Sequence, residues 1–119
     1  MATAMKWTQS NPLATEDDYP YVASDQSCKS GITGVVGCTS EVKIASESSS
    51  GLMASIETSP TSVAIEADKL VFQFYTSGIM NSENCGTNLD HGVLAVGYGT
   101  ESGQNYYLVK NSWNTSWGD

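Results

Sequence analysis

Basic residues are scarce in this sequence, and so are long apolar runs. Five lysine or arginine residues stand against 13 aspartate or glutamate residues, giving a formal net charge of −8 over 119 residues. Negative charge of this size repels phosphate backbones and anionic lipid, which argues against nucleic acid and membranes as partners. The longest apolar-rich run, residues 92–99, is far too short to cross a bilayer. Residues 1–7 lack the charged-then-apolar layout of a signal peptide, so we expect no signal segment there.

Cysteine and histidine are also few. The three cysteines, Cys28, Cys38 and Cys85, form no C-x-x-C pair, and His91 is the only histidine. This set argues against a structural zinc site, and we expect neither a metal nor a cofactor. Because three is an odd number, at least one cysteine is free or is paired outside this chain.

Composition and periodicity predict one small α+β domain. Hydrophobic residues make up 39% of the chain and charged residues 15%, which is typical of a globular protein. A short helix is predicted over residues 2–9, ended by Asn11-Pro12. A second helix is predicted from a cap at residues 48–50 through Ile56, and Pro60 ends it.

The other predicted elements are strands, and most lie in the C-terminal half. Apolar alternation or near-continuous apolar runs there favour a mainly antiparallel sheet. The candidate strands are residues 42–44, 63–65, 72–75, 93–98 and 106–109.

The last two strands place the single histidine opposite an asparagine. The glycine-flanked residues 99–103 suit a hairpin loop, and a hairpin centred on Glu101 sets His91 across from Asn111. Opposed side chains lie close enough for the amide oxygen to reach an imidazole N–H and fix the tautomer of the ring. Trp113 then follows where its indole could cover that hydrogen bond.

A plainer interpretation fits the same spacing. A lone histidine at a strand end is more often a structural residue than a catalytic one. Trp113 and Trp117 would ordinarily pack in the core, and Asn111 would ordinarily bond at a strand end.

The blocks D-H-G-V-L-A-V-G-Y-G and Y-Y-L-V-K-N-S-W resemble the histidine and asparagine blocks of papain-family cysteine peptidases, the cathepsin L-like branch in particular. The stretches E-D-D-Y-P-Y and P-T-S-V-A-I-E-A agree with the same family. The resemblance implies a fold of two lobes, in which residues 1–119 are a single partial domain, the mainly antiparallel, barrel-like, sheet-rich right lobe with one or two short helices. Residues 1–12 would be a short helix belonging to the edge of the other lobe.

The resemblance also implies roles for individual residues. His91 would be the general base and acid, Asn111 would orient it, and Trp113 would shield their contact, with Trp117 and Asp90 in support. The substrate pocket would include Ala64, Leu89 and Gly92, which suits apolar side chains, although ordinary core packing explains Ala64 and Leu89 almost as well.

The nucleophile of the family stands in a C-G-S-C-W block after a glutamine, and neither feature occurs here. By resemblance, Cys28 would bridge to the helical lobe and Cys85 to a loop beyond residue 119. Cys38 has no family counterpart, and a Cys28–Cys38 pair is a possible substitute.

Three functions stay open at this point. The first is the histidine-bearing part of a cysteine endopeptidase, which cleaves polypeptides only with a cysteine-bearing lobe or another chain as partner. The second is a catalytically inactive papain-derived module for assembly or protein binding, and the third is an inhibitor or decoy. By resemblance we expect a lysosomal, vacuolar or extracellular location.

Asn114 stands where the family has glycine and opens the glycosylation sequon N-T-S. Asparagine tolerates a left-handed backbone, so the fold should accept it. We predict that Asn114 carries no glycan, because a glycan would crowd the neighbouring indole of Trp113. An intact mass equal to that of the bare chain is expected, and added hexose increments would contradict this.

Overall fold

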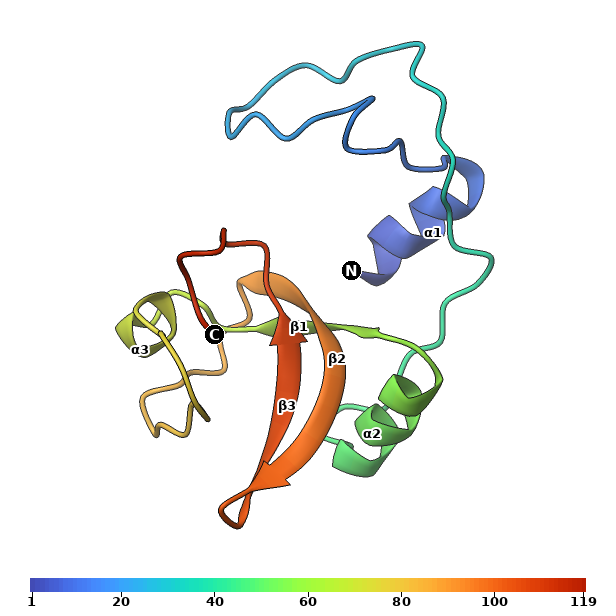
Figure 1. Cartoon of the computed structure of the whole chain (residues 1–119). Coiled ribbons are helices and arrows are strands. Elements are labelled where there is room, and N and C mark those ends of the chain that lie inside the picture. Colours follow the sequence, from blue (N-terminus) through green and yellow to red (C-terminus); the bar gives the residue numbers. More distant parts are fainter. The chain divides into compact units, whose positions relative to one another are not determined.

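Three short helices and one three-stranded sheet make up the secondary structure in the computed structural model, which describes all residues 1–119 (Figure 1). The chain forms two compact units, residues Met1–Lys43 and Ile44–Asp119. None of the helices combines the length and the hydrophobicity of a membrane span.

The first unit contains α1 (Ala2–Ser10) and a long irregular segment. The predicted stop is confirmed, because α1 ends at Ser10 and the next residue, Asn11, caps it with a backbone N–H that donates to the Trp7 carbonyl (3.0 Å). An isolated bridge joins Leu13 to Val36. No apolar residue of this unit is buried, and its one buried residue is Thr8.

The second unit holds the sheet and the remaining helices. The helix α2 (Ser49–Thr58) begins as predicted, with the Ser48 hydroxyl accepting the Gly51 N–H at 3.1 Å. It packs against β1 (Thr61–Ile65) and β2 (His91–Glu101). The antiparallel order is β1-β2-β3, with β3 spanning Gln104–Lys110. The buried apolar side chains of this unit are Ile56, Ala67, Phe72, Val93 and Ala95.

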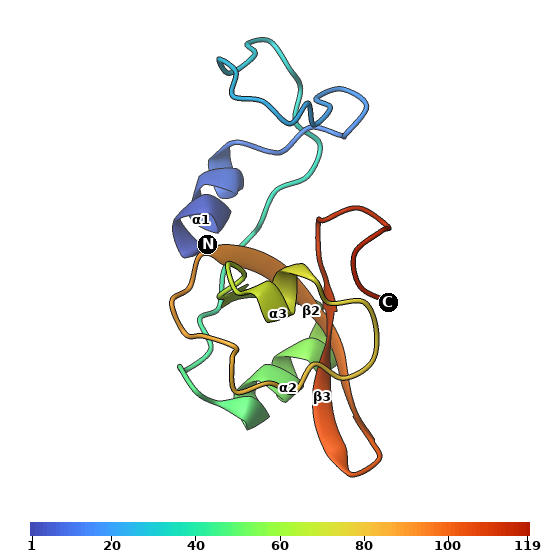
Figure 2. The same cartoon turned by 90° about the vertical axis from the view of Figure 1, so that its left-hand side faces the viewer.

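The register of the β2–β3 hairpin differs from the prediction. Glu101 pairs with Gln104 across a two-residue turn, and both turn residues have positive φ (Ser102 51°, Gly103 81°), as a type I′ turn requires. An irregularity between Ala95 and Gly97 then shifts the pairing by one residue, and β2 curves along its length (Figures 1 and 2). Leu94 consequently pairs with Lys110, not with Leu108 as the predicted centre requires.

Two predicted strands are absent. Residues 42–44 form no strand, because no neighbouring segment pairs with them, and Val42 is 89% exposed. The segment predicted as a strand at residues 72–75 overlaps the helix α3 (Leu70–Gln73). A spacing of three residues brings Phe72 and Tyr75 against the same indole of Trp117, with ring centroids at 4.8 and 5.4 Å. In a strand consecutive residues point to opposite faces, so Phe72 and Phe74 would share one face and would not differ so much in burial.

This correction gives a stability test. Phe72 is 7% exposed and Phe74 is 75% exposed, so Phe72→Ala should lower the free energy of unfolding by about 3–5 kcal/mol. Phe74→Ala, the matched control, should change it by less than about 0.5 kcal/mol. Urea titration followed by tryptophan fluorescence measures both, and equal losses would contradict the helical assignment.

Candidate functional site

His91 is held by its place at the start of β2. It pairs with Ile65, the last residue of β1, and its side chain is half-buried. The preceding residue, Asp90, donates its backbone N–H to the Ile65 carbonyl (3.0 Å), and its Oδ1 accepts the Ala67 N–H (2.7 Å). The point where the chain enters β2 is therefore tied to β1 by backbone and side chain alike.

Asn111 reaches His91 from the residue after β3. Its Oδ1 lies 2.8 Å from the Nε2 of His91. The predicted contact therefore forms, although the predicted register does not, because Asn111 follows the last paired residue, Lys110. Asn111 lies one residue beyond the last β2–β3 pair, and its side chain extends from there to the His91 ring.

The hydrogen bonds of Asn111 assign the tautomer of His91. The same Oδ1 also accepts the backbone N–H of Ser112 at 2.8 Å. A backbone N–H can only donate, so this atom is the amide oxygen, and the ring nitrogen facing it must carry a proton. The neutral ring is therefore the Nε2–H form, with its lone pair on Nδ1, the nitrogen that can serve as a base.

An indole covers this contact. The ring of Trp113 stacks on His91, with centroids 5.1 Å apart and an angle of 30° between the planes. Trp113 also meets Phe72 and Trp117 edge-on, at 5.3 and 5.5 Å. The indole Nε1–H of Trp117 donates to the Phe72 carbonyl (2.8 Å), which ties the C-terminal loop to α3. The indole of Trp113 is therefore packed between the His91 ring and two further aromatic rings.

Asn114, directly after this indole, has φ of 51°. The sequence argument that asparagine can take the place of glycine here is confirmed, because the backbone is left-handed at this residue. Its Oδ1 accepts the Thr115 N–H at 2.6 Å.

The candidate pocket residues are partly brought together. Ala64 and Leu89 line a cavity of about 290 Å³, whose wall also includes Ile65, Phe72 and Met80. Gly92 does not line this cavity, although it pairs with Ala64 across the β1–β2 ladder. The cavity wall also contains Glu66 and Lys69, which the sequence analysis did not select.

The cysteines form no disulfide within the chain, so the alternative Cys28–Cys38 pair is absent. Cys28 and Cys85 are exposed and Cys38 is half-buried. No group of three or more His, Cys, Asp or Glu side chains is placed to hold a metal ion.

Residues 1–119 match the family model for papain family cysteine proteases along the whole chain. The chain belongs to the papain family of cysteine proteases. It is 46% identical over 122 residues to digestive cysteine proteinase 3 of Homarus americanus, covering 100% of this chain and 38% of that protein. It thus spans little more than a third of this relative and aligns to the C-terminal portion.

Solved structures of the papain family share the fold. The bromelain protease of Ananas comosus, in complex with the E64 inhibitor, superposes with a TM-score of 0.87 at 36% identity, covering 99% of this chain and 55% of that one. Digestive procathepsin L 3 of Tenebrio molitor larval midgut superposes with a TM-score of 0.88 at 34% identity, covering 100% and 40%. The α+β fold predicted from the sequence is thereby confirmed.

The tautomer assignment gives a direct test. Asn111→Ala removes the acceptor that selects the Nε2–H form, and one lost hydrogen bond of about 1 kcal/mol should change the tautomer ratio about fivefold. The single histidine makes the ¹⁵N spectrum of the ring unambiguous.

The matched control is Asn105→Ala, at the far end of the same hairpin, where Asn105 accepts from the Thr100 hydroxyl. It should leave the ring spectrum of His91 unchanged. An unaltered tautomer ratio in Asn111→Ala would contradict the assignment.

Proposed function

We propose that this chain is the histidine- and asparagine-bearing part of a papain-like cysteine endopeptidase, active only when a cysteine-bearing segment completes the site. The observation that carries the proposal is the 2.8 Å contact between His91 Nε2 and Asn111 Oδ1. It holds a base with Nδ1 available, which is the arrangement that activates a thiol nucleophile.

The proposed reaction uses His91 twice. Its Nδ1 takes the thiol proton, forming an imidazolium beside a thiolate, and the thiolate attacks the peptide carbonyl carbon. The imidazolium then gives the proton to the leaving amine, which leaves an acyl-enzyme thioester. Water, deprotonated by the same nitrogen, hydrolyses the thioester and restores the thiol. Asn111 acts by keeping Nε2–H as the fixed end of the ring throughout.

The thiol is proposed to come from outside this chain. Cys85, which shares the unit of His91, is exposed and makes no hydrogen bond to the ring. No cysteine of the chain stands in the C-G-S-C-W context of the family nucleophile. We therefore expect no hydrolysis by the chain alone.

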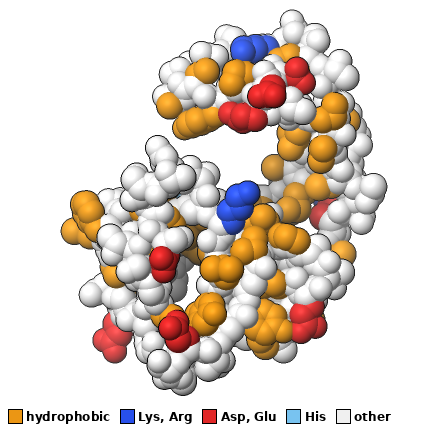
Figure 3. Space-filling model, viewed as in Figure 1, with side chains coloured by type: hydrophobic (Ala, Val, Ile, Leu, Met, Phe, Trp, Pro, Cys, Tyr) orange, Lys and Arg blue, Asp and Glu red, His pale blue; other side chains and the backbone are white.

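Exposed apolar side chains support a completing segment. Leu70, Phe74, Leu89 and Leu108 are all more than half exposed, and Figure 3 shows hydrophobic side chains at the surface of the face viewed. Apolar surface of this kind normally marks an interface. The Nδ2 of Asn111 is also buried without a hydrogen-bond partner, so an acceptor from a completing segment would satisfy it.

The substrate is proposed to be a polypeptide with an apolar side chain near the scissile bond. Ala64 and Leu89 give the 290 Å³ cavity an apolar wall beside the start of β2, and Gly92 leaves the adjoining strand without a side chain. We propose a lysosomal, vacuolar or extracellular setting, where disulfides of Cys28 and Cys85 to other segments would persist.

The first measurement is native mass spectrometry of the chain isolated from its source, followed by denaturing mass analysis of whatever accompanies it. We expect a cysteine-bearing partner segment, and the assembled species should hydrolyse a fluorogenic peptide amide with an apolar residue second from the cleaved bond. In this species His91→Ala should lower the rate by about 10²- to 10⁴-fold or more, because the general base is lost.

The control is again Asn105→Ala, which should retain full activity. An assembled species that contains a papain-like cysteine segment yet shows no hydrolysis would refute the peptidase proposal and favour an inactive module. Recovery of unrelated partner proteins would also refute the peptidase proposal, and it would favour a binding, inhibitory or decoy role for the chain.

A further inference from the structure

Glu66 is a buried acid directly after β1, and only 4% of its side chain is exposed. Burying a carboxylate is costly unless charge and hydrogen bonds compensate it. The groups that compensate the Glu66 carboxylate therefore show which segments it connects.

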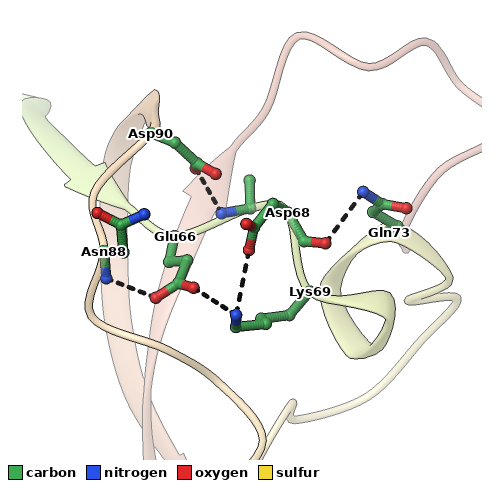
Figure 4. Close-up of polar contacts among 7 residues, drawn as sticks. Glu66, Asp68, Lys69, Gln73, Asn88 and Asp90 are labelled. Atoms are coloured by element: carbon green, nitrogen blue, oxygen red, sulfur yellow. Dashed lines mark hydrogen bonds and ion pairs between the residues drawn. The ribbon is translucent and has the colours of Figure 1, made fainter.

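Both oxygens of Glu66 have partners from two different segments. Oε1 lies 2.8 Å from the Nζ of Lys69, and Oε2 accepts the backbone N–H of Asn88 (Figure 4). Lys69 belongs to the segment that leaves β1, whereas Asn88 lies three residues before His91. The carboxylate thus joins the exit from β1 to the loop that enters β2.

A second set of bonds, from Asp90, lies next to this contact. As described above, Asp90 binds the Ala67 N–H through its Oδ1 and the Ile65 carbonyl through its N–H, and Figure 4 shows the two acids bridging the same pair of segments. The β1–β2 ladder ends at the pair Ile65 and His91. Glu66 and Asp90 therefore continue the connection past the last rung, directly ahead of the histidine.

The fit around the carboxylate is close. A Cβ added to Gly86 would lie 1.9 Å from the Oε2 of Glu66, so no side chain fits at residue 86 unless one of the two groups moves. The loop over residues 86–88 is thus packed directly on the carboxylate, and its path depends on Glu66.

We propose that Glu66 is a positioning residue for His91: its carboxylate fixes the loop of residues 86–88, and through it the entry to β2 and the ring that must meet Asn111. The inference rests on the proposed function for its catalytic meaning. Its physical content, the effect of Glu66 on the ring, can be measured in the chain alone.

The ionisation of Glu66 sets the pH range over which its contacts with Lys69 and Asn88 stabilise the fold. The hydrogen bond from Lys69 has the largest effect on the pKa of Glu66 and lowers it from its ordinary value of 4.5. The hydrogen bond from the Asn88 N–H also lowers this pKa, whereas burial opposes both effects. A lowered folded-state pKa means that the stabilisation is complete above the unfolded-state pKa and is lost as the pH falls through the folded-state value. The other charged groups here are Asp68, 3.6 Å from Lys69, and Asp90.

The experiment compares the unchanged chain with Glu66→Ala and Glu66→Gln, using ¹⁵N spectra of the His91 ring and hydrogen exchange of the Asn88 amide. Spectra are recorded at mildly alkaline pH, where imidazole is neutral. Glu66→Ala should speed Asn88 exchange at least about tenfold, as expected for a lost hydrogen bond to a charged acceptor, and should move the tautomer ratio toward that of Asn111→Ala. Glu66→Gln retains an acceptor for Asn88 and should give a smaller change in both.

The matched control is Asp68→Asn, which removes the second carboxylate beside Lys69, a group that forms no hydrogen bond or ion pair with residues 86–90. It should leave both readouts unchanged. A second control, Ile56→Val, weakens the core on α2 without touching the loop, and should lower global stability while leaving the tautomer ratio as it is.

Two results would overturn the proposal. One is a Glu66→Ala chain that unfolds more easily but keeps the His91 tautomer ratio and the Asn88 exchange rate of the unchanged chain. The other is an equal change in Asp68→Asn. Neither depends on hydrolysis, so an inactive assembled species with a shifted ring in Glu66→Ala would contradict the peptidase proposal alone.

Discussion

One hydrogen bond, from the Nε2 of His91 to the Oδ1 of Asn111, is the constraint on which the rest of the site depends. It joins the first residue of β2 to the residue after β3, so it requires both strands to begin and end in the right place. The two-residue turn and the irregularity near Val96 set that place, because each changes which residues face one another. The indole of Trp113 then stacks on the His91 ring, and Phe72 and Trp117 pack edge-on against that indole.

The orientation of His91 is well defined, whereas the apolar core of residues Ile44–Asp119 is small. A three-stranded sheet with two short helices is enough to orient an imidazole, because orientation needs only the local ladder and its neighbouring hydrogen bonds. Burial of the apolar side chains is less complete, because five apolar residues are buried whereas Leu70, Phe74 and Leu108 remain exposed. The orientation of His91 is thus fixed by a short ladder even though Leu70, Phe74 and Leu108 stay exposed.

The sequence predicted the parts of this structure that depend on local pattern. Near-continuous apolar runs identified the strands of the hairpin, and the serine cap identified α2. It failed where tertiary contacts decide, since Phe72 belongs to a helix because of its contacts with Trp113 and Trp117, which lie about forty residues away. The histidine and asparagine were paired correctly through a wrong register, because the hairpin was centred on Glu101 and not on Ser102-Gly103, and because the irregularity between Ala95 and Gly97 was not predicted. Glu66 was missed because the contact that ties it to the entry of β2 is with the backbone N–H of Asn88, 22 residues away, which no residue type reveals.

The connections that hold His91 differ in how they respond to acid. Backbone bonds such as Asp90 N–H to Ile65 carbonyl do not titrate, whereas the Glu66 carboxylate does. Lys69 and the Asn88 N–H keep the pKa of that carboxylate below its ordinary value, so Glu66 stays ionised in weakly acidic surroundings in which an unpaired glutamate would begin to take up protons. In the lysosomal or vacuolar setting that we propose, the orientation of His91 would have to persist under such conditions. By our proposal, the ion pair of Glu66 with Lys69 keeps the entry to β2 in place under those conditions.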